Sequence, residues 1–260
     1  MKFKLENYIK DRFIHTKSAN PIRFIYYFFH KYLKKTSKKT YTRTGLDLLI
    51  SHFFRNQSSG IYIDIGCYHP THGSNTYLLH QKGWLGINLD LDDVSIEYFN
   101  RSRKNSYNKK IALSDKKGFI NLYRPHQKSA GQSVDQFTVS RMKQEDLEII
   151  KIECDTLNNI IDQSPFADRQ IDFISIDVEG HEITILKEFN FERYRPKLIA
   201  LEFNDPELKR IDFEFNSIDS LLKSDLHLLL TSKNYHFVNW TNNDVVYISN
   251  DEYSKREVIK

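Results

Sequence analysis

The chain has 260 residues, of which 40% are hydrophobic, 28% charged and 13% aromatic, and its formal net charge is +4. This hydrophobic content excludes a disordered chain, and nine Gly and six Pro exclude collagen-like and low-complexity sequences. No apolar run is long enough to cross a bilayer as a helix, and the charged N-terminus lacks the pattern of a secretory signal. The two cysteines, Cys67 and Cys154, predict reduced thiols and a cytoplasmic location.

Positive charge is concentrated in the first 44 residues. They hold twelve Lys/Arg against two acids, a net charge of +10, so the other 216 residues carry a net charge of −6. Residues 22–35 combine Phe and Tyr with Lys and Arg, a composition that suits a helix on a bilayer surface. We therefore predict a basic aromatic N-terminal helical arm, residues 1–44, before a second domain, residues 45–260.

Two arrangements of the arm are open. Its aromatic side can pack on the second domain, which is favoured because core helices outnumber interfacial ones, or the arm can contact the inner face of a membrane peripherally. No nucleic-acid partner is expected, since the acidic remainder of the chain offers no second basic patch for a phosphate backbone.

From residue 45 onward the pattern alternates between helices and strands. The first predicted elements are a helix over 46–54, a strand over 61–66, a helix from Ser74 to Lys82, a strand over 84–90 and a helix capped by Asp92 or Asp93. They are followed by a strand near 110–114, a hairpin strand over 118–123, a polar functional loop over 124–145 and a strand over 148–154.

The second half of the domain continues this alternation. It predicts helices over 156–161, 182–189 and 218–222, and strands over 171–177, 196–203, 235–240 and 244–248. Strands spaced by helices predict an α/β fold with a doubly wound, mostly parallel sheet. The last two strands are joined by a turn too short for a crossover, so they are predicted to form a C-terminal antiparallel hairpin.

Residues at the ends of the first two strands indicate the ligand, because open α/β sheets bind ligands at the carboxyl ends of their strands. Asp64 and Gly66 end the first strand, and the glycine allows a tight turn and a close approach to the backbone. The next glycine comes only at Gly73, which disfavours a dinucleotide cradle and therefore an NAD-dependent enzyme. Asp90 ends the second strand and can accept hydrogen bonds from a ribose. Together these residues favour a nucleoside without phosphates, a description that fits S-adenosylmethionine.

Five stretches of the sequence resemble the FkbM-type methyltransferase family. They are residues 62–70, 74–77, 83–90, 112–115 and 171–182. The most specific is the Asp-Val-Glu-Gly-His-Glu run of residues 177–182, and the likeness spans more than half of the chain. The resemblance implies a seven-stranded Rossmann-like methyltransferase fold and S-adenosylmethionine as cofactor. It also implies O-methylation of a hydroxyl on a small-molecule or glycan acceptor, either a sugar or a secondary metabolite.

The resemblance also assigns residues to the cofactor. These are Asp64, Gly66, Cys67, Asn75, Asp90, Ala112, Leu113, Ser114 and Asp177. Asp64, Gly66 and Cys67 would hold the methionine end and Asp90 the ribose, while residues 112–114 would lie beside the adenine. Asp177 would sit where the methyl group meets the acceptor. Leu91-Asp92 stands where the family often has a proline, a departure on the adenine side.

Methyl transfer to an oxygen requires a base for the hydroxyl proton. The candidates are His69, His72, Asp177, Glu179 and His181. Histidine suits the task because its pKa lies near neutrality, and Asp177 because burial raises the basicity of a carboxylate. Glu179 and His181 have a second possible role as helix caps. No metal is predicted, although Asp177, Glu179 and His181 form an alternative ligand set. A membrane-docked binding module without catalysis is the other class of function.

Overall fold

The structure is a computed structural model that describes residues 24–25, 27–28, 38–125, 147–203, 217–241 and 243–257. The chain forms two units, Met1–Lys39 and Thr40–Lys260. This division falls five residues before the predicted boundary, because the chain just after Lys39 is tied to Asp47. Thr40 Oγ1 donates to Asp47 Oδ1 at 2.6 Å, and Tyr41 N donates to Asp47 Oδ2 at 2.8 Å. Most of the predicted loop 124–145 lies outside the described residues.

The first unit contributes four described residues of the predicted arm helix. Phe24, Ile25, Tyr27 and Phe28 are helical, and between 51% and 68% of each residue's surface is exposed. In the part of the chain that the structure describes, no helix combines the length and the hydropathy that crossing a membrane would require.

The second unit contains a seven-stranded sheet. In spatial order its strands are β3 (Tyr107–Lys110), β2 (Leu85–Asp90), β1 (Ile61–Ile65), β7 (Phe173–Ile176), β8 (Leu198–Glu202), β10 (Asp244–Ser249) and β9 (Tyr235–Thr241). The first five strands are parallel, whereas β10 runs antiparallel to both β8 and β9. This confirms the predicted fold class and its C-terminal hairpin. The order reverses at β1, which has β2 on one side and β7 on the other, so a ligand site is expected there.

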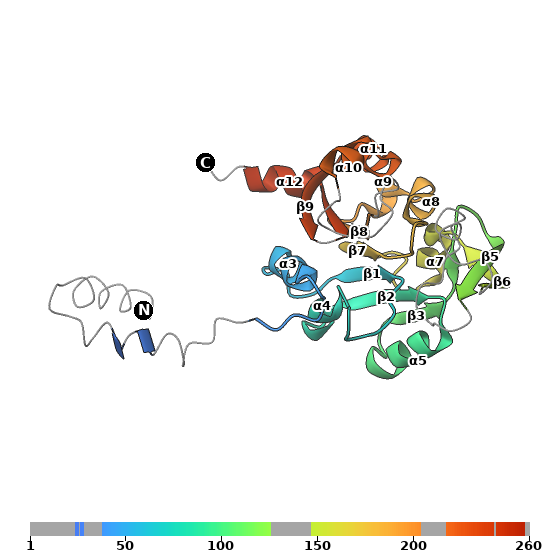
Figure 1. The fold of residues 1–260 in the computed structure, drawn as a ribbon, viewed down its shortest axis with the longest axis horizontal. Coiled ribbons are helices and arrows are strands. Elements are labelled where there is room, and N and C mark those ends of the chain that lie inside the picture. Colours follow the sequence, from blue (N-terminus) through green and yellow to red (C-terminus); the bar gives the residue numbers. More distant parts are fainter. Residues whose placement is uncertain are drawn as a thin grey trace. The chain divides into compact units, whose positions relative to one another are not determined.

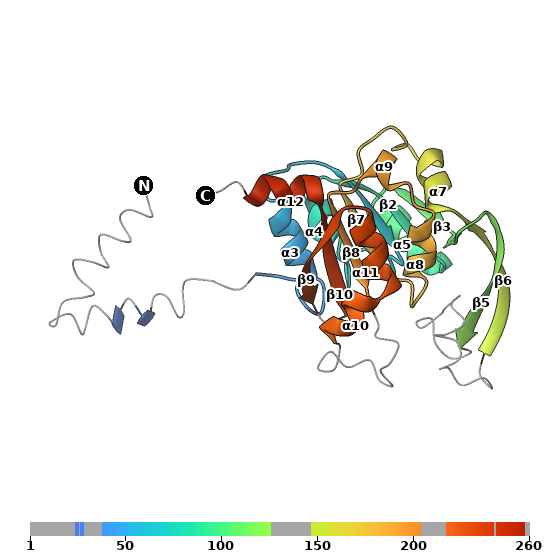
Figure 2. The ribbon, with the colours of Figure 1, turned by 90° about the horizontal axis from the view of Figure 1, so that it is seen from above.

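A second, smaller sheet corrects the prediction of the third strand. It consists of β4 (Ala112–Leu113), β6 (Leu147–Asp155) and β5 (Gly118–Pro125), and Figure 2 shows β5 and β6 at the β3 end of the large sheet. The predicted strand near 110–114 is therefore two strands in different sheets. β3 ends at Lys110, and Ala112 pairs with Cys154 of β6.

Helices cover both faces of the large sheet (Figure 1). They are α3 (Leu46–Phe53), α4 (Tyr77–Gln81), α5 (Asp93–Ser102), α7 (Leu157–Gln163), α8 (Glu182–Lys187), α9 (Phe191–Tyr194), α10 (Ile218–Lys223), α11 (Asp225–Ser232) and α12 (Asn250–Glu257). Asp92 caps α5 as predicted, since its side chain accepts from Ser95 N at 3.0 Å. Ser74 does not cap α4, which begins at Tyr77 with Thr76 as its N-cap.

The side chains of β1 alternate between two cores. Ile61, Ile63 and Ile65 pack in the core formed with α7 to α11. Tyr62 points to the other face and packs in the core formed with α3 and α4. Because side chains two residues apart in a strand share a face, Asp64 lies on the same side of the sheet as Tyr62. The side chain of Asp64 therefore points toward α4 and the loop that precedes α4.

Candidate active site

A cavity of about 530 Å³ lies at the carboxyl ends of β1, β2 and β7. Its wall consists of residues 42–44, 64–68, 73–75, 89–91, 111–113, 175, 177–179, 181, 185, 202 and 243–244. Most of the predicted site residues are among them, whereas His69 and Ser114 are not. The structure therefore brings together residues as far apart in the sequence as Thr42 and Asp244.

The turn after β1 depends on Gly66. Its φ of +73° lies in the left-handed region that favours glycine, and its N–H donates to Leu89 O of β2 at 2.9 Å. A Cβ atom added here would lie 1.8 Å from the carbonyl oxygen of Asp177. Only a glycine therefore lets the turn after β1 come this close to the residue that follows β7. Gly66 and Asp177 both line the cavity, so this close approach is part of its wall.

Asp90 is held by the backbone on both of its oxygens. Oδ2 accepts from Tyr68 N at 2.7 Å, and Oδ1 accepts from Asp92 N at 2.9 Å. Burial raises the pKa of Asp90, and these N–H donors oppose that rise. Each carboxylate oxygen has lone pairs beyond the one that is used here, so Asp90 remains able to accept from a ligand.

Asp64 is a nearly buried carboxylate, with 5% of its surface exposed. Thr76 Oγ1 donates to its Oδ2 at 2.5 Å. Burial raises the pKa of Asp64 to about 6, while the positive charge of Arg103 lowers it. The group is therefore ionised at neutral pH and becomes protonated in mild acid.

Three other residues predicted to bind the cofactor take different positions. Asn75 lines the cavity and its Nδ2 donates to Ser175 Oγ of β7 at 3.0 Å. Cys67 lines the cavity too, but its side chain packs with Ile96 and Phe99, and burial raises the pKa of its thiol. Ser114 lies outside the lining and hydrogen-bonds to Asp115 at 3.1 Å, so Ile111 stands in the wall beside Ala112 and Leu113 instead.

A carboxyl cluster of Asp177, Glu202 and Asp244 lines the cavity on the β7, β8 and β10 side. Asp244 is the cross-strand partner of Glu202, and Glu202 hydrogen-bonds to Asp177. Burial raises the pKa of Asp177, and burial together with the charge of Asp177 raises the pKa of Asp244 to about 7. Two hydrogen-bonded carboxyls must share a proton, so Asp177 and Glu202 hold one between them, while Asp244 takes up or releases a proton near neutrality.

The turn between β7 and α8 carries Glu179 and His181 into the same wall. Glu179 has a φ of +53°, and burial and the charge of Asp177 raise its pKa. His181 is the N-cap residue of α8 but makes no side-chain cap hydrogen bond. Glu182 instead holds the turn that precedes α8, since its Oε1 accepts from Val178 N at 3.1 Å and from Gly180 N at 3.3 Å.

His69 has a structural role in the loop, which argues against its predicted part as base. It does not line the cavity. Its Nδ1 accepts from Thr71 N and His72 N, both at 3.1 Å. A neutral imidazole that accepts at Nδ1 carries its proton on Nε2, and so has no free lone pair for an acceptor proton. His72 does not line the cavity either.

The metal alternative gains no support from the geometry. Across the ranges that the structure describes, no group of three or more His, Cys, Asp or Glu side chains is arranged to hold a metal ion. Asp177, Glu179 and His181 share the wall without forming such a group.

Sequence reasoning missed Glu202, Asn243 and Asp244. Glu202 ends a buried strand, so the same strand-end pattern that singled out Asp64 and Asp90 was present for it. Asp244 begins β10, which runs antiparallel to β8, and its first residue therefore reaches the edge where the parallel strands end. A search restricted to the carboxyl ends of strands overlooks such a residue.

The sequence matches the methyltransferase FkbM domain over residues 64–237, more than half of the chain. The chain belongs to the FkbM methyltransferase family. Membership confirms the predicted family, the class of enzyme and S-adenosylmethionine as cofactor. No curated protein matches the sequence.

Three of the solved structures similar to this FkbM-family chain are methyltransferases. They are a TehB-like SAM-dependent methyltransferase from Corynebacterium glutamicum (11% identity, TM-score 0.37, covering 88% of this chain and 96% of that one), a methyltransferase from Geobacter sulfurreducens (10%, 0.40, 95% and 96%) and an O-methyltransferase from Bacillus cereus in complex with SAH (11%, 0.39, 94% and 96%). Because these identities and TM-scores are low, the assignment of the chain to its family depends on the domain match alone.

The residues of the cavity fit S-adenosylmethionine. The close turn at Gly66 leaves backbone accessible beside β1, and no glycine-rich phosphate cradle follows it. Asp64 and Asp90 offer carboxylates at the ends of neighbouring strands, while residues 111–113 supply an apolar wall. The cofactor bears a ribose, an aromatic base and two positive charges, and this donor set complements all three.

Proposed function

We propose that this FkbM-family enzyme methylates a hydroxyl oxygen of a sugar, a glycan or a secondary metabolite. The observation that supports this is the carboxyl cluster of Asp177, Glu202 and Asp244, which lines the same cavity as Asp90. A hydroxyl must lose its proton as its oxygen is methylated, and buried carboxylates with raised pKa values are suited to take it. A polyhydroxyl acceptor can also donate hydrogen bonds to the remaining oxygens of the cluster.

In this proposal the cofactor is held by the β1 and β2 ends. Asp90 accepts from the ribose hydroxyls, and Asp64 faces the positively charged amino group at the methionine end. Gly66 and Cys67 bring backbone close to the same end, and Asn75, fixed by Ser175, closes this side. Ala112 and Leu113, with Ile111, pack against the base.

The chemistry that bound S-adenosylmethionine supplies is an in-line methyl transfer, in which the S–C bond breaks, the electron pair stays on sulfur and the O–C bond forms. Asp177 orients the acceptor hydroxyl and receives its proton. The hydrogen bond from the Glu202 carboxyl keeps the Asp177 oxygens in place and spreads the proton over both groups. Glu179 and His181 line the acceptor side and complete its polar wall.

The test is methyl transfer by the purified protein to a panel of sugars, glycans and hydroxylated metabolites, with amine and thiol analogues alongside. We expect products that carry an O-methyl group, identified by mass spectrometry. Transfer to the amine or thiol analogues alone would refute the proposal.

Replacing Asp177 tests the proton acceptor. We expect Asp177→Asn to lower turnover by about 10²–10⁴-fold, while the dissociation constant of S-adenosylmethionine changes little. The matched control is Asp162→Asn, because Asp162 is an exposed carboxylate paired with Arg193 and should leave turnover unchanged. Near-native turnover of Asp177→Asn would remove Asp177 from the proton transfer.

We also propose that the enzyme works in the cytoplasm at the inner membrane face, with residues 1–44 on the lipid. The exposed Phe24, Ile25 and Phe28 and the net charge of +10 in this segment support the proposal. The free, buried Cys67 and Cys154 suit a reducing compartment. The full chain should float with vesicles that contain anionic lipid, and Phe24→Ser/Phe28→Ser should not. Equal flotation of both proteins, or none with the native chain, would contradict the docking.

A further inference from the structure

Arg103, which directly follows α5, is a buried cation that is not part of the cavity lining. Only 1% of its surface is exposed. All of its hydrogen bonds recorded among the described residues run to neutral groups, so no carboxylate neutralises it by direct contact. A guanidinium is costly to bury without such a partner, so its retention here requires a reason.

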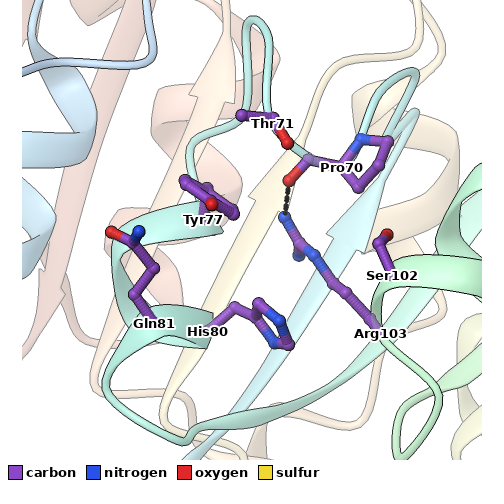
Figure 3. Close-up of a pocket in the computed structure, with 7 residues that line it drawn as sticks. All are labelled: Pro70, Thr71, Tyr77, His80, Gln81, Ser102 and Arg103. Atoms are coloured by element: carbon purple, nitrogen blue, oxygen red, sulfur yellow. Dashed lines mark hydrogen bonds between the residues drawn. The ribbon is translucent and has the colours of Figure 1, made fainter.

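One part of the guanidinium fixes the loop that follows β1. Nη2 donates to Pro70 O at 2.5 Å and to Ser74 Oγ at 3.0 Å. Figure 3 shows the side chain reaching from the end of α5 to Pro70, with Tyr77 and His80 of α4 nearby. A single side chain thus ties both ends of the segment between Pro70 and Ser74, the segment that leads into the cavity residues 73–75.

The other part of the guanidinium reaches Asp64 through Thr76. Nη1 donates to Thr76 Oγ1 at 2.8 Å, and that hydroxyl donates to Asp64 Oδ2 at 2.5 Å. Nη1 also donates to Tyr62 OH at 2.8 Å, on the same face of β1. The buried cation and the buried carboxylate are therefore joined by one hydroxyl, and each lowers the cost of burying the other.

The charge of Arg103 also opposes the effect of burial on Asp64. Burial raises the pKa of Asp64 and Arg103 lowers it, with the result near 6. Without Arg103, the pKa of Asp64 would rise further, which favours the protonated form, and a protonated carboxyl cannot balance the cationic amino group of a methyl donor.

A hollow of about 390 Å³ beside Arg103 does not explain why a cation is buried at this position. The hollow is lined by Pro70, Thr71, Tyr77, His80, Gln81, Ser102 and Arg103 (Figure 3). Arg103 offers it almost no surface, because its Nη donors turn to the loop and to β1. The connections of Arg103 therefore point to the cofactor cavity and not to a ligand in the hollow.

We propose that Arg103 is a positioning residue of the methyl-donor site, which fixes the loop after β1 and, through Thr76, keeps Asp64 oriented and charged. The inference rests on the proposed function in one respect, the assignment of Asp64 to the methionine end of the cofactor. It predicts that the state of Asp64 depends on Arg103 even in the cofactor-free protein.

The experiment compares Arg103→Gln and Arg103→Lys with Arg101→Gln in the full chain. Arg101 lies in the last turn of α5, pairs with Glu97 and has a 76% exposed side chain, so it controls for the loss of a charge. Carboxyl ¹³C NMR follows the titration of Asp64 in the cofactor-free proteins. Calorimetry gives the dissociation constant of S-adenosylmethionine at pH 7 and pH 8.5.

For Arg103→Gln we expect the Asp64 midpoint to rise by about one unit or more and the dissociation constant at pH 7 to rise about tenfold or more. The loss should shrink at pH 8.5, where Asp64 ionises again. Arg103→Lys should keep the Asp64 midpoint near the native one but still weaken binding, because an ammonium cannot span Pro70 and Thr76 as a planar fork does.

A folded Arg103→Gln with a native Asp64 midpoint and native affinity would overturn the proposal. If Arg103→Gln does not fold, native affinity of Arg103→Lys overturns it instead. If the native protein itself fails to bind S-adenosylmethionine, the proposed function fails, whereas the Asp64 titration still decides the link to Arg103.

Discussion

At the scale of single residues, the site is a set of carboxylates that the fold places in different environments. Asp90 is surrounded by backbone N–H donors, Asp64 lies within reach of a buried cation, and Asp177 lies among other acids. In the proposed function the same functional group binds a ribose at Asp90, balances a positive charge at Asp64 and accepts a proton at Asp177, and the neighbours of each carboxylate are what suit it to its role.

The role of Asp90 can be tested by removing its side chain. Hydrogen bonds to a charged group contribute about 1.5–3 kcal/mol each, so Asp90→Ala should weaken S-adenosylmethionine binding by roughly 10–100-fold. Calorimetry measures the dissociation constant. Asp93→Ala is the control, because Asp93 is an exposed acid three residues later that pairs with Lys110. An unchanged binding curve for Asp90→Ala would show that the ribose lies elsewhere.

Sequence alone could locate Asp64, Asp90 and Asp177, because each follows or ends a predicted strand and parallel strands end at one edge. Arg103 could not be found in this way. It lies in a polar run, residues 100–108, that reads as an exposed helix end, and only the packing of α5 against β2 buries it. His69 shows a limit of residue type as a guide, since a histidine suggests a base, whereas in the loop its Nδ1 accepts from the backbone N–H groups of Thr71 and His72.

At the scale of elements, strands with apolar runs were predictable and the edge strand was not. β3 has the sequence Tyr-Asn-Lys-Lys and is half-exposed, so it carries no apolar signal. The apolar residues 111–113 just after it line the cavity, and Ala112 and Leu113 enter the small sheet. The separate helix α11 was missed because Ser224 both ends α10 and caps α11. The local sequence pattern therefore predicts the buried helices and strands, but it does not show where one element ends and the next begins.

The turn after β1 gives a prediction at this scale. Gly66→Ala should lower the melting temperature and abolish S-adenosylmethionine binding, because its Cβ would collide with Asp177 O and its φ is positive. The control is Gly83→Ala. Gly83 has a φ of +87°, but an added Cβ would meet nothing within 4 Å, so that variant loses only about 1–2 kcal/mol of stability, through backbone strain. Calorimetry measures S-adenosylmethionine binding and thermal melts measure stability in both variants. The difference between the two variants gives the effect of the Cβ collision, because both share the effect of backbone strain. Equal losses in the two variants would mean that the approach of Gly66 to Asp177 is unimportant.

At the scale of the whole molecule, the buried acids tie the stability of the cofactor-free protein to pH. Asp244 has a folded pKa of about 7 against 3.8 for the free side chain, so the folded state binds its proton more tightly than the unfolded state does. This contribution is fully present below about pH 4 and is lost as the pH rises through 7. Its full size is about 4 kcal/mol, from three pKa units at 1.36 kcal/mol each.

Asp244→Asn should therefore remove part of the pH dependence of stability. Urea unfolding between pH 4.5 and 8 should show the free energy of unfolding of the native protein falling relative to that of the variant as the pH rises. Asp219→Asn, on α10 and away from the cavity wall, should follow the native curve. Parallel curves for the native protein and Asp244→Asn would show that Asp244 is not protonated in the folded state.

The place of β10 in the sheet has a consequence for the newborn polypeptide. β10 lies between β8 and β9, although the ribosome makes β9 before it. Until β10 emerges from the exit tunnel and inserts, β9 has no docking edge, and the last stretch of the cavity wall, residues 243–244, is absent. The cavity wall is therefore complete only after translation has passed β10, and the side that holds Asp244 is the last to form.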